Sequence, residues 1–151
     1  MQKNETKSIG RLISIIHRQS RVYFHRHLEP YGLGHGQIPI LMYIIHHEGT
    51  TQHDISRHFQ MDKGSTSSLI KNLEKNDFIQ KEQNTNDKRC YGLYITDKTR
   101  NLLPEFKKIF QGLTEILIEG FTETEKEKSF EILNRMIANI EKSNGMKGGH
   151  Q

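Results

Sequence analysis

Residues 50–79, TTQHDISRHFQMDKGSTSSLIKNLEKNDFI, constrain the fold of this chain more than any other segment. Thr51 is a favourable N-cap for a short helix, and Ile55 and Phe59 lie on one face of that helix. After a break at residues 60–61, Asp62 is a favourable N-cap for a longer helix. A short helix, a tight turn and a longer helix together predict a helix-turn-helix.

The longer of these two helices carries different residue types on its two faces. Its predicted buried positions are Thr66, Leu69, Ile70 and Leu73. Its outward positions are small, polar or basic, namely Gly64, Ser65, Ser67, Ser68, Lys71, Asn72 and Lys75. An outward face without large apolar side chains is what a helix needs to enter a major groove of DNA.

A β-hairpin is predicted directly after this helix. Residues 78–83 alternate weakly as a strand, and the turn-forming cluster NTNDKR follows at residues 84–89. Tyr91, Leu93 and Ile95 then share one face of a second strand. A helix-turn-helix followed by a two-stranded hairpin is a winged helix, so we expect a mainly α fold with a small β-hairpin.

Long amphipathic helices flank the winged helix. Apolar or aromatic-ring residues recur at helical spacing at Ile9, Leu12, Ile13, Ile16, Tyr23, His27 and Tyr31. A second helix is expected over residues 37–47, and Thr96 caps a long helix in which Pro104 introduces a kink unless it falls in the first turn. Gly120 ends that helix, and the capping box of Thr122 and Glu125 starts the last one.

The 151 residues suit a single chain with one winged helix-turn-helix part, expected at residues 33–96. Residues 8–31 and 97–142 form the flanking helices, and the Gly-rich residues 143–151 are expected to be a disordered tail. The apolar stripes of the flanking helices are too long for one small core to cover. We therefore expect these segments to be dimerisation helices of a homodimer.

The segment from Leu33 to Thr96 resembles the MarR (multiple antibiotic resistance regulator) family of winged helix-turn-helix transcriptional regulators. The resemblance is carried by the polar helix GSTSSLIKNLEKNDFI, by the spacing of Asp87 and Arg89, and by YGLYIT before the next helix. Three positions depart from the family pattern. Ser68 stands where the family commonly has Arg, and Asp77 and Thr99 stand where it often has Gly.

The polar helix and the wing of the predicted winged helix are both suited to bind duplex DNA. Ser65, Ser67 and Ser68 are short enough to let the helix approach base edges, while Lys63 and Lys71 reach phosphates. At the wing, Arg89 suits a minor groove and Asp87 holds the guanidinium through a bidentate pair, with Lys88 between them. The family resemblance implies the same roles for Asp87 and Arg89.

The resemblance also implies a homodimeric repressor of a pseudo-palindromic operator, released by a small aromatic or phenolic effector. A ligand pocket in such a protein lies between the dimerisation helices and the winged helix. The residues expected near it are His17, Arg21, Tyr31, His35 and Tyr43.

The sequence also permits other functions. A winged helix that binds a protein partner has the same sequence pattern, and a solvated polar face is the plainer account of residues 62–75. A metal-responsive regulator is less favoured, since His25 with His27 and His46 with His47 lack the i, i+4 spacing of a helical zinc pair. Cys90 beside Arg89 leaves a redox-responsive regulator open. No nucleophile motif, phosphate loop, metal-ligand spacing or cofactor motif points to an enzyme.

The charge and hydropathy of the chain fit this interpretation. The net charge is +4, which permits a polyanionic partner. No apolar run is long enough to span a membrane, and the first residues lack the pattern of a secretory signal. We therefore expect a soluble, cytoplasmic protein without membrane contacts.

Overall fold

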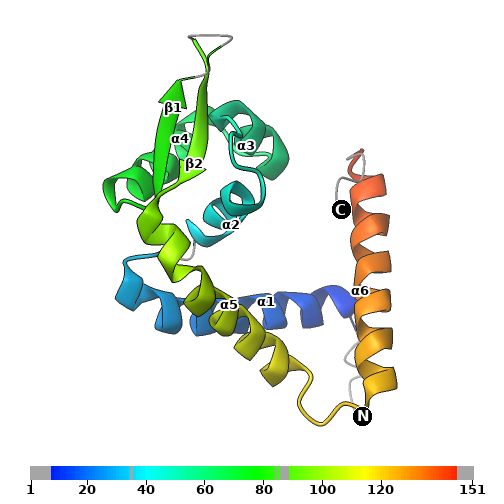
Figure 1. Cartoon of the computed structure of the whole chain (residues 1–151). Coiled ribbons are helices and arrows are strands. Elements are labelled where there is room, and N and C mark those ends of the chain that lie inside the picture. Colours follow the sequence, from blue (N-terminus) through cyan, green and yellow to red (C-terminus); the bar gives the residue numbers. More distant parts are fainter. Residues whose placement is uncertain (1–7, 35, 84, 86–88, 146–151) are drawn as a thin grey trace. The chain divides into compact units, whose positions relative to one another are not determined.

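The computed structural model describes residues 8–34, 36–83, 85 and 89–145, and it confirms a mainly α fold with one β-hairpin (Figure 1). The elements in chain order are α1 (Ile9–Leu28), the 3-10 turn η1 (Glu29–Tyr31), α2 (Ile38–His46), α3 (Gln52–Phe59), α4 (Lys63–Lys75), β1 (Ile79–Gln83), β2 (Tyr91–Ile95), α5 (Asp97–Leu117) and α6 (Glu123–Ser143). The predicted helix-turn-helix is α3 and α4, and the predicted hairpin is β1 and β2. The chain divides into two compact units, residues 1–110 and 111–151, so the boundary falls inside α5.

The core of the first unit is built from one face of each element of the winged helix. Its side chains, all at most 3% exposed, include Ile44 from α2, Ile55 from α3, Ile70 and Leu73 from α4, Phe78, Leu93 and Ile95 from the hairpin, and Phe106 from α5. Burial of a large aliphatic or aromatic side chain contributes about 1.5–3 kcal/mol, so these residues dominate the stability of the unit.

Helix α1 packs on the first part of α5 near its own C-terminal end. The Tyr23 hydroxyl donates to the carbonyl of Ile109 at 3.0 Å, and the rings of Phe24 and Phe110 lie 4.9 Å apart. Leu28 is the buried residue of α1. The N-terminal half of the predicted apolar face stays exposed within this chain, since Ile9, Leu12, Ile13 and Ile16 are 45–57% exposed.

The hairpin is antiparallel, with Ile79 paired to Ile95 and Gln83 paired to Tyr91. Leu93 also bonds to Thr50, so the loop between α2 and α3 runs along the other edge of β2. This approach is close, because a Cβ on Gly92 meets the carbonyl oxygen of Gly49 at 3.2 Å and the Tyr94 ring at 2.9 Å. Leu93 and Ile95 are buried, whereas Tyr91 on the same face is half-exposed.

The second unit contains the end of α5 and all of α6. Gly120, at φ +79, follows α5, and the predicted capping box forms, with Glu125 accepting from the Thr122 backbone amide and its own amide donating to the Thr122 hydroxyl. Helix α6 continues to Ser143, one residue beyond the predicted helical segment. Pro104 lies well inside the first part of α5, which continues through it, so the alternative of a first-turn proline does not apply.

Along α6, Phe130, Leu133, Ile137 and Ile140 form an apolar stripe that is 42–59% exposed. Exposed stripes of this kind are typical of surfaces that bind another chain. Among the described residues, no helix combines the length and apolar character needed to cross a bilayer.

Candidate nucleic-acid interface

A buried hydroxyl of α4 is hydrogen-bonded to α3. Thr66 of α4 is fully buried, and its Oγ1 accepts a hydrogen bond from Ser56 Oγ of α3 at 3.0 Å. The same Oγ1 donates to the carbonyl of Asp62 at 2.9 Å. Because Thr66 has a partner on each side, rotation of one helix against the other breaks a hydrogen bond in the interior.

The N-terminus of α4 is capped by Asp62, as predicted. One carboxylate oxygen accepts from the Ser65 backbone amide at 2.8 Å and the other accepts from the Ser65 hydroxyl at 2.6 Å. These two bonds, the hydroxyl first, lower the pKa of Asp62 and keep it ionised. The Ser65 hydroxyl therefore donates its hydrogen to the Asp62 cap in this structure. Its oxygen can still accept a hydrogen bond from a base edge.

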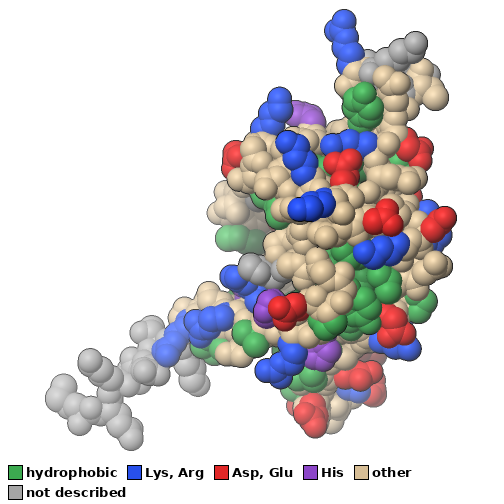
Figure 2. Space-filling model, turned by 90° about the vertical axis from the view of Figure 1, so that its left-hand side faces the viewer, with side chains coloured by type: hydrophobic (Ala, Val, Ile, Leu, Met, Phe, Trp, Pro, Cys, Tyr) green, Lys and Arg blue, Asp and Glu red, His purple; other side chains and the backbone are tan. Residues whose placement is uncertain are grey.

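The residues predicted to contact DNA from this helix lie on its outer face. Lys63, Ser65, Ser68 and Lys71 are exposed, and Ser67 is half-buried. Several Lys and Arg side chains gather on the face shown in Figure 2, at the height of α4 and the hairpin. This face is small, polar and basic, which suits contact with a polyanion at close range.

An ion pair joins α4 to the hairpin. Lys81 Nζ of β1 lies 2.9 Å from Glu74 Oε2 of α4, and both side chains are about two-thirds buried. Between the two elements, Asp77 has φ +59, a left-handed conformation that glycine adopts more readily. Glycine at this position would adopt the same conformation with less strain.

The tip of the wing is described only in part. Arg89 is exposed at the end of the loop, as a groove contact requires, and Cys90 beside it is an exposed cysteine that forms no disulfide. Asp87 and Lys88, which were also predicted to contact DNA, lie outside the described residues.

A cavity of about 470 Å³ lies between α1, α2 and the first part of α5. Its lining is mostly apolar, from Phe24, Gly36, Ile38, Pro39, Met42 and Phe110, with His17, Ser20 and Arg21 as the polar side chains. The structure thus brings together His17 and Arg21 of the predicted ligand pocket. Tyr31 packs on Phe106, Tyr43 lines a different cavity, and His35 lies outside the described residues.

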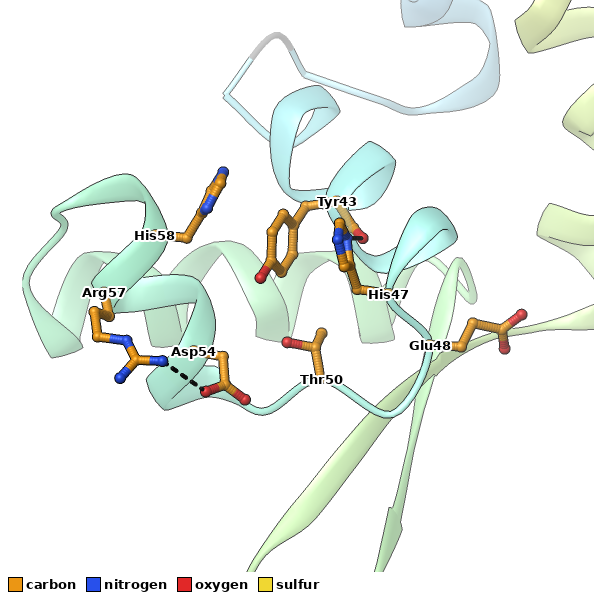
Figure 3. Close-up of a pocket in the computed structure, with 7 residues that line it drawn as sticks. All are labelled: Tyr43, His47, Glu48, Thr50, Asp54, Arg57 and His58. Atoms are coloured by element: carbon orange, nitrogen blue, oxygen red, sulfur yellow. Dashed lines mark hydrogen bonds and ion pairs between the residues drawn. The ribbon is translucent and has the colours of Figure 1, made fainter. Parts of the chain in front are cut away.

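A second cavity, of about 480 Å³, opens between the C-terminal end of α2 and α3 (Figure 3). The Tyr43 ring stands between two imidazoles, with centroids 4.3 Å from His47 and 4.5 Å from His58. His47 Nδ1 lies 2.9 Å from the carbonyl of Tyr43, and Arg57 lies 3.8 Å from Asp54 at the rim. Because an imidazole lies on each face of Tyr43, a planar ligand cannot stack on that ring.

His47, Glu48, Asp54 and His58 line the cavity between α2 and α3, but among the described residues they do not form a metal-binding group. In the described part of the chain, no three His, Cys, Asp or Glu side chains lie where they can hold one ion. His25 instead lies 3.6 Å from Glu29 on the surface, and His27 stacks on Tyr23.

Sequence reasoning missed the contacts that join α5 to the turn after α4. The Thr99 hydroxyl donates to the carbonyl of Phe78 at 2.6 Å, and the Thr96 hydroxyl donates to that of Asp77 at 2.6 Å. Thr96 also accepts from the Thr99 amide at 3.3 Å, as its predicted cap role requires. The available signal was that Asp77 and Thr99 both replace a common Gly of the family pattern.

Comparison with known proteins agrees with this arrangement. The model of the MarR family matches residues 33–91. The HTH-type transcriptional regulator BilQ of Clostridioides difficile is 32% identical over 79% of this chain and 80% of its own length.

Two solved structures have closely similar folds over nearly their whole length. A MarR transcriptional regulator from Methanosarcina mazei superposes with a TM-score of 0.83 at 32% identity, covering 89% of this chain and 96% of that one. A protein assigned to the MarR family from Listeria monocytogenes, solved in complex with a 26mer DNA, gives a TM-score of 0.79 at 28% identity, covering 95% and 99%.

Proposed function

Because the chain belongs to the MarR family of DNA-binding winged helix-turn-helix transcriptional regulators, we propose that it is a homodimeric repressor of a pseudo-palindromic operator. The proposal includes release from the operator by a small aromatic or phenolic effector. Its place of action is the cytoplasm, since its partner is duplex DNA. Its relatives are transcriptional regulators rather than enzymes.

The outer face of α4 is the observation that carries this proposal. Ser65, Ser67 and Ser68 present short side chains to a groove, and the exposed Lys63 and Lys71 reach phosphates. The wing residues Asp87, Lys88 and Arg89 complete the proposed set of contacts, with Arg89 in the neighbouring minor groove. A protein of similar fold from Listeria monocytogenes was solved in complex with a 26mer DNA, which supports DNA as the partner.

Fluorescence anisotropy on two duplexes tests DNA recognition. A duplex that the protein selects from a random-sequence DNA pool is compared with a scrambled duplex of the same composition, at two salt concentrations. Specific recognition predicts tight, salt-sensitive binding that the scrambled duplex does not compete away. Equal, weak binding to both duplexes refutes sequence-specific regulation and favours the alternative, a winged helix that binds a protein partner.

Single substitutions test the assignment of contacts. Lys71→Ala is expected to lower affinity for both duplexes and to reduce the salt slope by about 1, because one phosphate contact is lost. Arg89→Ala is expected to weaken binding of the selected duplex while circular dichroism stays unchanged. Lys128→Ala, an exposed lysine of α6, is the matched control and leaves both quantities unchanged. An unaltered salt slope for Lys71→Ala removes it from the interface.

The apolar stripes on α1 and α6 support the homodimer. Each stripe repeats at helical spacing and is about half exposed in the single chain, which is unfavourable in water. Leu133→Lys places a charge in the α6 stripe and is expected to shift the protein towards monomer in sedimentation equilibrium. Asn139→Lys on the opposite side of α6 is the control. A wild-type monomer at micromolar concentration contradicts the proposal.

The cavity beside His17 and Arg21 supports the effector site. An apolar lining with one guanidinium at its edge suits a ligand with an aromatic body and an anionic group. Benzoate and 4-hydroxybenzoate are suitable first probes, measured for release of the selected duplex. Arg21→Gln is expected to raise the ligand concentration needed for release, because the anionic group of the ligand loses the guanidinium. The ligand releases DNA only if it binds the DNA-free protein more tightly than the DNA-bound protein. Release that is unaffected by Arg21→Gln and by Met42→Trp, which fills the cavity, refutes this site.

A further inference from the structure

Three consecutive backbone carbonyls between α4 and β1 each accept a hydrogen bond from the start of α5. The donor and acceptor pairs, each at 2.6 Å, are Lys98 Nζ with Asn76, Thr96 Oγ1 with Asp77 and Thr99 Oγ1 with Phe78. We call these three bonds the turn latch. Because the carbonyls belong to the turn that joins α4 to the hairpin, the latch fixes the directions in which these two elements leave the turn.

The turn is held in a conformation that its sequence disfavours. Asp77 has φ +59, where an L side chain crowds its own backbone and glycine does not. The backbone amide of Asp77 donates to Glu74 and that of Phe78 donates to Leu73, which closes the end of α4. A strained residue persists when the surrounding contacts over-determine its conformation, and here the latch supplies them.

Thr99 is the buried member of the latch. It is 0% exposed, and its hydroxyl bonds to a carbonyl that lies 21 residues earlier in the chain. The Phe78 carbonyl also accepts from the Thr96 amide at 3.2 Å. Loss of the Thr99 hydroxyl therefore loosens the turn without leaving this carbonyl unpaired, so the fold is expected to survive.

We propose that Thr99 is a positioning residue for DNA recognition. Its hydroxyl acts through the Phe78 carbonyl to hold the strained turn at Asp77, and so sets the orientation of α4 relative to the wing. This inference rests on the proposed contacts of α4 and the hairpin with DNA. It adds a residue that touches no DNA and that stands where the family pattern often has Gly.

The consequence for binding follows from geometry. The base contacts of α4 and the groove contact of the wing form together only if the two elements keep a fixed angle. Phosphate contacts tolerate small displacements, since they depend on charge more than on register. Loss of the latch therefore lowers binding of the preferred duplex and spares binding of a scrambled one.

The experiment compares Thr99→Val, which is nearly isosteric and lacks the hydroxyl, with Thr99→Ser, which keeps it. Thr124→Val, at an exposed threonine of α6, is the control. Affinities for the selected and the scrambled duplex are measured by anisotropy, after titration with excess DNA has fixed the active fraction of each protein. Thr99→Val is expected to weaken binding of the selected duplex by about three- to tenfold, the effect of one hydrogen bond. The scrambled duplex, Thr99→Ser and Thr124→Val are expected to show no such loss.

A second comparison tests the link to Asp77. In an Asp77→Gly background the turn is no longer strained, so Thr99→Val is expected to cost little affinity. An equal loss in both backgrounds overturns the link, and equal weakening of both duplexes overturns the positioning role in favour of general destabilisation. Lys71→Ala in the same assay separates the two proposals. If it leaves both affinities unchanged, the DNA interface itself is wrongly assigned.

Discussion

Thr66→Val is expected to destabilise the protein by about 2 kcal/mol, through the hydroxyl that joins α3 to α4. Thr66 is fully buried, so valine fills nearly the same space and the change isolates the hydroxyl. Two hydrogen bonds are lost, to Ser56 and to the Asp62 carbonyl, each worth about 0.5–1.5 kcal/mol net.

The partner substitution is expected to cost less. Ser56→Ala removes one of the two bonds and leaves Thr66 donating to Asp62, so about 1 kcal/mol is lost. Either substitution alone removes the bond between Ser56 and Thr66, so the double variant loses this bond only once. The combined loss is therefore expected to be smaller than the sum of the single losses by about 1 kcal/mol.

Urea denaturation followed by circular dichroism measures the free energy of unfolding of the wild type, the two single variants and the double variant. Ser14→Ala serves as control, because its hydroxyl bonds to the carbonyl of Gly10 on an exposed surface and its loss is expected to cost less than about 0.5 kcal/mol. Additive losses for Ser56→Ala and Thr66→Val, within about 0.3 kcal/mol, refute the direct bond between the two helices.

Three further substitutions test other parts of the winged helix. Gly92→Ala is expected to lower the melting temperature, since its Cβ meets the Tyr94 ring at 2.9 Å and the Gly49 carbonyl oxygen at 3.2 Å, and an unchanged melting temperature contradicts that close approach. Gln60→Gly is expected to raise the free energy of unfolding by up to about 1 kcal/mol, because Gln60 has φ +50; urea denaturation that shows a loss refutes the strain. Hydrogen bonds from the Thr51 hydroxyl, and secondly from its backbone amide, lower the pKa of Asp54 in the folded protein. The ionised Asp54 therefore stabilises the fold fully above the ordinary aspartate pKa, and this stabilisation is lost as the pH falls through the lowered pKa of the folded state. Melting curves from neutral to acid pH should therefore show Asp54→Asn converging on wild type, and a constant difference contradicts the linkage.

Contacts between residues close in the chain were predictable. The caps formed by Thr51, Asp62 and Thr122 each join residues three apart, so residue type and spacing identify them without knowledge of the fold. The burial of Thr66 followed from its place on the same helical face as Ile70 and Leu73, and the structure confirms it.

Contacts between residues distant in the chain were not predictable. The ligand pocket was inferred from positions along helices, yet Tyr43 lines the cavity between α2 and α3, while His17 and Arg21 line the other. Which helix faces meet depends on interhelical angles, and these follow from packing of the whole core.

The sequence by itself determined the order of helices and strands, their caps and the polar outer face of α4, because hydrogen bonds within one or two turns and the helical period decide these features. The tertiary structure decided how the recognition helix is held. The bonds from Ser56 to Thr66 and from Thr99 to Phe78 span 10 and 21 residues. Such bonds form only where separate elements meet. Elements are brought together by hydrophobic burial, which is non-directional, so the sequence of one segment does not show which residues of another segment it will contact.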